Sequence, residues 1–83
     1  MVTKVLTLYS TSACHLCELA ETMLSQAGVA IGGLQIHIVD ISESDDLFAR
    51  YGVRIPVVAD IDGREIGWPF TMEELETFLK QGQ

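Results

Sequence analysis

Positive charge is scarce in this chain. Five lysines and arginines stand against twelve aspartates and glutamates, which gives a formal net charge of −7 at neutral pH. A surface of that sign repels phosphate backbones and anionic lipid headgroups at long range. We therefore expect no nucleic-acid partner and no membrane partner, whereas neutral and basic partners remain open.

Long hydrophobic runs are also absent. No stretch of the sequence approaches the length that a membrane-spanning helix needs. The first residues contain no extended apolar region followed by a small-residue cleavage signal, so secretion is not indicated. We expect a cytoplasmic protein, in which thiols are kept reduced and a disulfide is more often transient than structural.

Linkers, repeats and low-complexity segments are missing, and 83 residues suffice for one small domain. We expect a single domain over residues 1–83 that acts as a monomer. Its two cysteines lie so close in sequence that a disulfide between them restrains the unfolded chain very little. Stability must come from packing, for which a hydrophobic content of 48% provides the material.

The pattern of the first half of the chain predicts a strand, a helix and a second strand. Residues 2–9 are rich in β-branched and apolar side chains, and residues 14–27 have apolar positions at helical spacing. Gly28 supplies a stop signal for the helix. Residues 34–39 alternate as a strand, which is parallel to the first if the helix is a crossover.

The second half contains two predicted helices with a hairpin between them. Ser42 and Asp45 resemble a capping box that starts a short helix ending near Gly52. Thr71 and Glu74 form a better capping box, which opens a final amphipathic helix.

An Asp-Gly pair marks the turn of the hairpin, whose first strand covers residues 57–61. A two-residue loop sets Asp60 opposite Glu65, like charge against like. A three-residue loop with a left-handed Gly63 sets Asp60 opposite Arg64 instead, and we favour this register.

The two cysteines are the most informative feature that is present. Cys14 and Cys17 lie where the first strand gives way to the helix, and residues three apart lie on one side of a helix, so the sulfurs can close a disulfide. Unpaired N–H groups and the helix dipole at such a position stabilise a thiolate and lower its pKa. The helical pattern leaves Cys14 accessible and Cys17 partly covered.

This arrangement resembles the thioredoxin fold in its small, glutaredoxin-like form. The shared features are the order β-α-β-α-β-β-α, a Cys-x-x-Cys at the first strand-to-helix junction, and an Ile-Pro pair before the third strand. The segments that resemble a small bacterial glutaredoxin-like group are residues 10–17, 51–57 and 68–70. The resemblance implies an α/β fold with a four-stranded mixed sheet and three helices.

The resemblance also implies thiol-disulfide exchange. Cys14 would attack a disulfide and Cys17 would resolve the mixed disulfide, while a cis Pro56 would turn the Ile55 backbone toward an extended substrate. No metal or organic cofactor is needed. The residues expected to contact substrate are Ser12, His15, Ile55, Pro56 and Trp68.

The expected partners are a disulfide-containing protein or a glutathione mixed disulfide, together with a reductase that restores the dithiol. Glutaredoxins usually have a lysine shortly before the first cysteine, where this chain has residues 9–12, and a glycine pair after the hairpin, where it has residues 66–68. Without that lysine, a partner for the carboxylates of glutathione is missing. Glutathione is a possible co-substrate, but the missing lysine argues against it.

Two other classes of function compete with this interpretation. A non-catalytic adaptor would present Ile55, Pro56 and Trp68 to a partner protein. A metal or iron-sulfur carrier would use the two cysteines with His15 and His37 or a second chain, although structural zinc generally takes two paired knuckles and only one is present. His37 itself is best explained as an ordinary strand residue.

Three side chains each have two possible roles. His15 either favours the Cys14 thiolate electrostatically or is an exposed helix residue. Trp68 either forms a platform beside the site or caps the core. Arg54 either contacts a substrate carboxylate or pairs with the acidic surface.

Overall fold

Strands and helices alternate along the chain up to a β-hairpin, which a final helix follows. The computed structural model describes residues 4–12 and 14–80. In chain order its elements are β1 (Lys4–Ser10), α1 (His15–Ile31), β2 (Leu34–Asp40), the 3-10 helix η1 (Ile41–Glu43), α2 (Asp45–Tyr51), β3 (Val57–Asp60), β4 (Glu65–Gly67) and α3 (Met72–Lys80).

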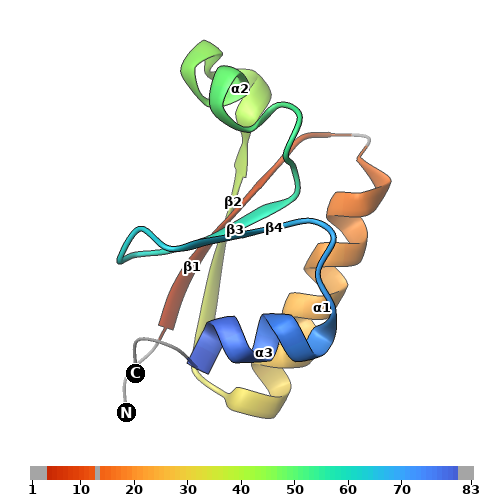
Figure 1. The fold of residues 1–83 in the computed structure, drawn as a ribbon, viewed down its shortest axis with the longest axis vertical. Coiled ribbons are helices and arrows are strands. Elements are labelled where there is room, and N and C mark those ends of the chain that lie inside the picture. Colours follow the sequence, from red (N-terminus) through yellow and green to blue (C-terminus); the bar gives the residue numbers. More distant parts are fainter. Residues whose placement is uncertain (1–3, 13, 81–83) are drawn as a thin grey trace.

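The strands form one mixed sheet in the order β2-β1-β3-β4 (Figure 1). β1 pairs in parallel with β2, from Lys4 opposite Leu34 onward, because α1 is the crossover between them. β3 runs antiparallel to both β1 and β4. Within the described residues, the sheet of four strands, the three α-helices and their order confirm the predicted thioredoxin-like architecture.

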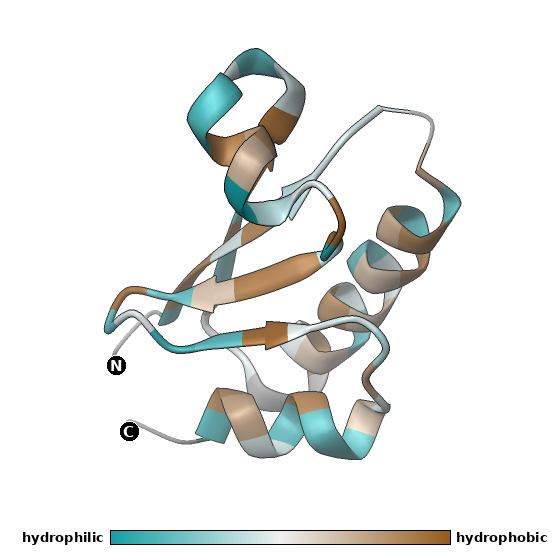
Figure 2. Ribbon diagram, turned by 45° about the horizontal axis from the view of Figure 1, so that its top comes forward, coloured by the Kyte–Doolittle hydropathy of each residue, from teal (hydrophilic) through white to brown (hydrophobic). Residues whose placement is uncertain are grey.

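Apolar side chains build cores on the two faces of the sheet, which follows from the alternation of strand residues. α1 and α3 lie together on one side, whereas α2 sits apart from them (Figure 1). The larger core comprises Leu6, Leu8, Ala20, Leu24, Ala27, Val58, Phe70, Leu75, Phe78 and Leu79. The smaller core, beside α2, comprises Ile41, Tyr51 and Val57, with Tyr9, Leu47 and Ile55 packed against it. Figure 2 shows the hydrophobic central strands between these layers.

The predicted end of α1 at Gly28 is wrong, since the helix continues to Ile31. Gly32 ends it: this residue has a φ of 79°, which glycine adopts without a Cβ clash, and its N–H donates to the Gly28 carbonyl over 2.8 Å. A glycine inside a helix costs about 1 kcal/mol relative to alanine, which the packing of the helix offsets.

The predicted cap of α2 at Ser42 is also wrong. The Ser44 hydroxyl caps the helix by accepting the Leu47 N–H at 3.3 Å. Ser42 instead donates both its N–H and its hydroxyl to the Asp40 carboxylate, at 2.9 and 2.7 Å, and belongs to η1. These donors hold the pKa of Asp40 below its usual value.

The hairpin has the favoured three-residue loop. Ala59 pairs with Glu65, so that Asp60 stands opposite Arg64, and Gly63 has a φ of 93°. Thr71 and Glu74 form the predicted capping box, with reciprocal bonds of 2.9 and 3.0 Å.

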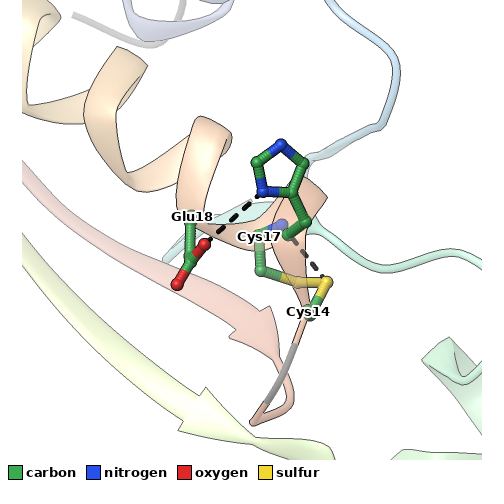
Figure 3. Close-up of a disulfide and its surroundings, with 4 residues drawn as sticks. Cys14, Cys17 and Glu18 are labelled. Atoms are coloured by element: carbon green, nitrogen blue, oxygen red, sulfur yellow. Dashed lines mark hydrogen bonds and ion pairs between the residues drawn. A yellow bond between two sulfur atoms is a disulfide. The ribbon is translucent and has the colours of Figure 1, made fainter.

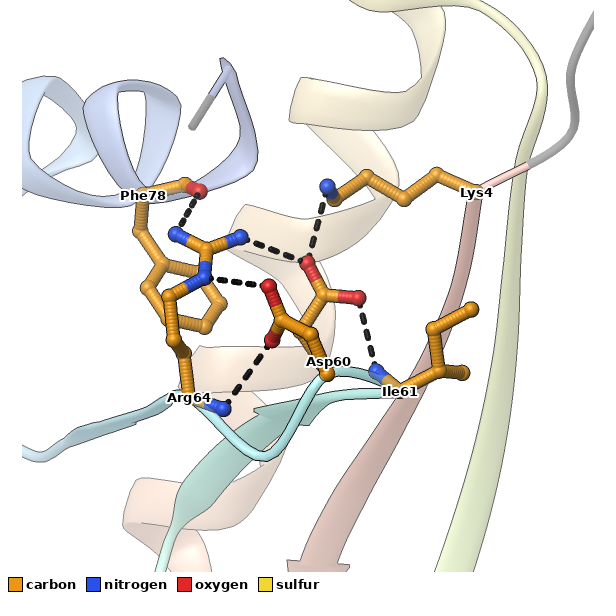
Figure 4. A network of polar contacts seen from close by, with 6 residues as sticks. Lys4, Asp60, Ile61, Arg64 and Phe78 are labelled. Atoms are coloured by element: carbon orange, nitrogen blue, oxygen red, sulfur yellow. Dashed lines mark hydrogen bonds and ion pairs between the residues drawn. The ribbon is translucent and has the colours of Figure 1, made fainter. Parts of the chain in front are cut away.

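Asp60 is the centre of a polar cluster at the end of β3 (Figure 4). Its carboxylate, with 4% of the side chain exposed, lies 2.8 Å from the Lys4 ammonium and 2.9 Å from the Arg64 guanidinium. Arg64 also donates to Asp62 at 2.7 Å and lies over the Phe78 ring. The cluster therefore fastens the hairpin to β1 and α3, at the end of β3 remote from Pro56.

Across residues 4–12 and 14–80, none of the helices combines the length and the apolar character that a bilayer crossing requires.

Candidate active site

Cys14 is the N-cap residue of α1. Its backbone is extended, with φ −104° and ψ 104°, and its carbonyl accepts the Glu18 N–H at 3.2 Å, as the first intrahelical bond. The Cys14 sulfur accepts the Cys17 N–H at 3.2 Å, which takes the place that a serine or aspartate oxygen has in an ordinary cap. A sulfur held in this way points at the unpaired N–H groups of the first helical turn.

Cys14 and Cys17 are joined as a disulfide, with their Cα atoms 5.2 Å apart (Figure 3). The two sides of this bond differ in exposure. Cys17 is 2% exposed, whereas Cys14 is only partly buried. A reactant arriving from solvent therefore reaches Cys14, and this is the order of exposure that the helical pattern predicts.

Pro56 lies beside this junction because of the strand register. Tyr9 pairs with Val57 at the end of an antiparallel ladder, so Pro56 enters β3 at the end of the sheet where β1 leads to Cys14. Pro56 is fully buried, and the Ile55–Pro56 peptide bond is cis, as predicted.

The backbone of Ile55, predicted to turn toward an extended substrate, makes one hydrogen bond within the chain. The Ile55 N–H donates to the Tyr51 carbonyl at 3.0 Å, continuing the turn that ends α2. Among the described residues no partner is found for the Ile55 carbonyl. Of the two backbone groups of Ile55, the N–H is thus already paired within the chain.

Trp68 joins the same end of the sheet to the core. The backbone N–H of Trp68 donates to the Pro56 carbonyl at 3.1 Å, and this bond extends the pairing of β3 with β4. Its ring is partly buried, packs against the larger core and meets Phe70 edge to face at 5.1 Å. The Trp68–Pro69 bond is also cis, which sequence reasoning missed because an X-Pro pair does not reveal its isomer.

The remaining predicted contact residues are exposed. Ser12 lies in the turn between β1 and α1. The His15 side chain is 81% exposed and its Nδ1 lies 3.6 Å from the Glu18 carboxylate (Figure 3). The negative charge of Glu18 therefore offsets any positive charge that His15 would place near Cys14.

His37 is an exposed residue of β2 whose ring nitrogen lies 3.3 Å from the Gln35 amide. Over the described part of the chain, no three histidine, cysteine or carboxylate side chains are grouped so as to hold a metal ion.

A polar cluster beside Pro56 escaped sequence reasoning. The Tyr51 hydroxyl donates to the Glu65 carboxylate at 2.5 Å, and the Arg54 guanidinium donates to its other oxygen at 3.0 Å. The Tyr9 ring stacks on Tyr51 at 4.2 Å. The bond to Glu65 raises the pKa of Tyr51 to about 12, and the same bond, with help from Arg54, holds the pKa of Glu65 below its usual value. The sequence allows two roles for Arg54, contact with a substrate carboxylate and pairing with the acidic surface. In the structure Arg54 forms an ion pair with Glu65.

Comparison with protein families gives a match over almost the whole chain. The model of the glutaredoxin-like domain (DUF836) matches residues 5–80. A search of curated proteins finds no match.

Solved structures show the same architecture. The X-ray structure of protein XcR50 from X. campestris is 40% identical, with a TM-score of 0.79 over 89% of this chain and 93% of that one. Protein Ne2328 from Nitrosomonas europaea is 19% identical, with a TM-score of 0.77 over 92% and 91% of the two chains. Oxidized mitochondrial thioredoxin 3 from Saccharomyces cerevisiae is 21% identical, with a TM-score of 0.65 over 96% and 79%. The last two show the thioredoxin fold alone. The family and the paired cysteines together support a redox role.

Proposed function

This chain belongs to the glutaredoxin-like domain family, and on that premise we propose that it is a thiol-disulfide oxidoreductase. The observation that supports the proposal most strongly is the position of the Cys14 sulfur. It lies at the N-terminus of α1, accepts the Cys17 N–H at 3.2 Å, and is the more exposed member of the pair. A thiolate is the reactive form of cysteine, and such a position favours it.

The first step is attack by the Cys14 thiolate of the reduced protein on one sulfur of a substrate disulfide. A bond forms between Cys14 and that sulfur, the substrate S–S bond breaks, and the second substrate sulfur leaves as a thiolate that takes a proton from water. The N–H of Cys17 and the helix dipole stabilise the attacking anion.

In the second step Cys17 loses its proton to solvent and attacks Cys14. This forms the Cys14–Cys17 disulfide present in the structure and releases the remaining half of the substrate as a thiol. The protein loses two electrons and the substrate gains them. A reductase donor then returns the protein to its reduced form. Burial of Cys17 restricts it to this intramolecular role, because a substrate cannot reach a sulfur that is 2% exposed.

We propose that the substrate lies across the cis Pro56 segment. Its backbone would donate to the Ile55 carbonyl, and its side groups would lie near Ser12, His15 and Trp68. The substrates proposed are disulfides of proteins or of glutathione. We propose that the protein acts on them as a monomer, in the cytoplasm.

The test is a single-turnover reaction of the fully reduced protein with bis(hydroxyethyl) disulfide, in which mass spectrometry follows each form. The wild-type protein is expected to lose its dithiol form without accumulating an adduct. Cys17→Ser is expected to accumulate an adduct on Cys14, and Cys14→Ser to show no exchange, because its remaining thiol at Cys17 is buried. Circular dichroism of both variants controls for folding. Equal reactivity of the two variants would contradict the proposed roles.

A further inference from the structure

Arg54 stands two residues before Pro56, and its guanidinium is already engaged. It lies 3.0 Å from one oxygen of Glu65 and over the Tyr51 ring at 5.3 Å. The other Glu65 oxygen accepts the Tyr51 hydroxyl, so both carboxylate oxygens are used. The Glu65 side chain is 28% exposed and the Arg54 side chain 47%, so the pair is held in place yet remains in contact with solvent.

Arg54 precedes Val57 at the end of β3 that is nearer to Cys14, and Glu65 of β4, which pairs with Ala59, meets it there through its side chain. The antiparallel ladder of β1 and β3 ends with Tyr9 opposite Val57, so the chain leaves β1 toward Cys14 at the same end at which it enters β3 from Arg54. Figure 1 shows α2 and the segment after it at the end of the molecule where α1 begins. A cation on this segment is therefore well placed to meet a group attached to a disulfide at Cys14.

The cations at this end are neutralised within the chain. Arg50 pairs with Asp46 at 3.6 Å, and Arg54 pairs with Glu65. Segments 14–21 and 40–56 contain these two arginines against six carboxylates. The carboxylates are Glu18, Glu21, Asp40, Glu43, Asp45 and Asp46.

Resting on the exchange activity proposed above, we propose that Glu65 determines the charge specificity of the site. By occupying Arg54, it leaves no cation for a substrate carboxylate, so that neutral and cationic disulfides react in preference to anionic ones. Glu65 touches no reacting atom and acts through Arg54. The preference thus arises as much from disfavouring anionic disulfides as from binding neutral and cationic ones.

The test compares three small disulfides that differ in charge: cystamine, which is a dication; dithiodipropionate, which is a dianion; and bis(hydroxyethyl) disulfide, which is neutral. Each is reduced to two thiols by the protein dithiol, so the chemistry and its electron balance are the same throughout. The quantity measured is the rate for the anionic compound divided by the rate for the neutral one. Differences in intrinsic reactivity cancel when this ratio is compared between variants.

Glu65→Gln keeps an oxygen for the Tyr51 hydroxyl and releases Arg54. It is expected to raise the anionic-to-neutral ratio about threefold, the size of one solvent-screened charge interaction. Adding Arg54→Met is expected to abolish the gain, and so is high salt, which screens exposed charges. Glu76→Gln on α3 removes the same charge far from Cys14, and its ratio is expected to stay near the wild-type value.

The two proposals fail in different ways. If the wild-type dithiol does not consume the neutral disulfide, the exchange function is wrong. If it does, but Glu65→Gln leaves the ratio unchanged or slows all three disulfides by the same factor, Glu65 has only a structural role and the present inference is overturned. A gain that survives Arg54→Met overturns it as well.

Discussion

The Tyr51 hydroxyl donates a hydrogen bond of 2.5 Å to the Glu65 carboxylate, across fourteen positions of sequence. Tyr51 is the last residue of α2 and Glu65 the first of β4, so this contact fastens the segment that leads to Pro56 onto the sheet. The Tyr9 ring stacks on the Tyr51 ring and links the same segment to β1. The strand that leads to Cys14 and the segment that leads to Pro56 thus share one anchor.

Tyr51→Phe is expected to lower the free energy of unfolding by about 1 kcal/mol, because it removes one hydrogen bond to a partly exposed charged group and keeps the ring stacking. Urea denaturation measures the loss. Phenylalanine cannot ionise, so the variant also isolates the titration of the phenol.

The pH dependence of this loss has a definite sign. The folded pKa of Tyr51, about 12, lies above its ordinary value of 10.0. The stability that the phenol contributes is therefore fully present below pH 10 and is lost as pH rises toward 12, because the unfolded chain ionises first. The difference between wild type and Tyr51→Phe should shrink over that window. A difference that stays constant or grows there would refute the assignment.

Asp60→Asn is expected to lower the free energy of unfolding by about 3 kcal/mol, because it removes the charge of a nearly buried carboxylate that faces both Lys4 and Arg64. Asp62→Asn is the matched control: this side chain is 45% exposed and pairs with the same Arg64, so its loss should be much smaller than that of Asp60→Asn. Urea denaturation compares the two variants. Equal losses would mean that Asp60 is not the centre of the cluster.

Thr71→Ala is expected to cost about 1 kcal/mol, because the Glu74 N–H loses the hydroxyl that caps α3 at 3.0 Å. Thr71→Ser keeps the hydroxyl and should retain most of the stability. Thermal or urea unfolding of both variants checks the cap, and an alanine variant as stable as the serine one would show that the bond contributes nothing.

Features that depend on neighbouring residues could be predicted from the sequence. The Cys14 and Cys17 pair, the capping box at Thr71 and the three-residue hairpin loop each follow from spacing within a few positions. The hairpin register was decidable because the alternative sets Asp60 against Glu65, two like charges.

Features that depend on a choice between two equivalent residues could not be predicted from the sequence. Gly28 and Gly32 are both sound stop signals, and Ser42 and Ser44 are both sound caps. The folded chain uses the second of each pair. Local pattern alone does not contain that information.

The cluster around Glu65 was out of reach for another reason. Tyr51, Arg54 and Glu65 come from a helix end, a loop and a strand, and they meet because the β3–β4 register and the end of α2 are both fixed. No short motif encodes such a meeting. The N–H of Ile55 likewise finds Tyr51 because α2 ends in a turn.

The central claim is that folding stabilises an anion on the Cys14 sulfur, and a thiolate titration tests it most directly. In reduced Cys17→Ser, Cys14 is the single thiol of the chain, so ultraviolet thiolate absorbance reports on it alone. We predict a midpoint below the value of about 8.5 that is typical of free cysteine, and a return toward that value when the protein is unfolded in urea. A folded midpoint at or above the unfolded one would contradict the account.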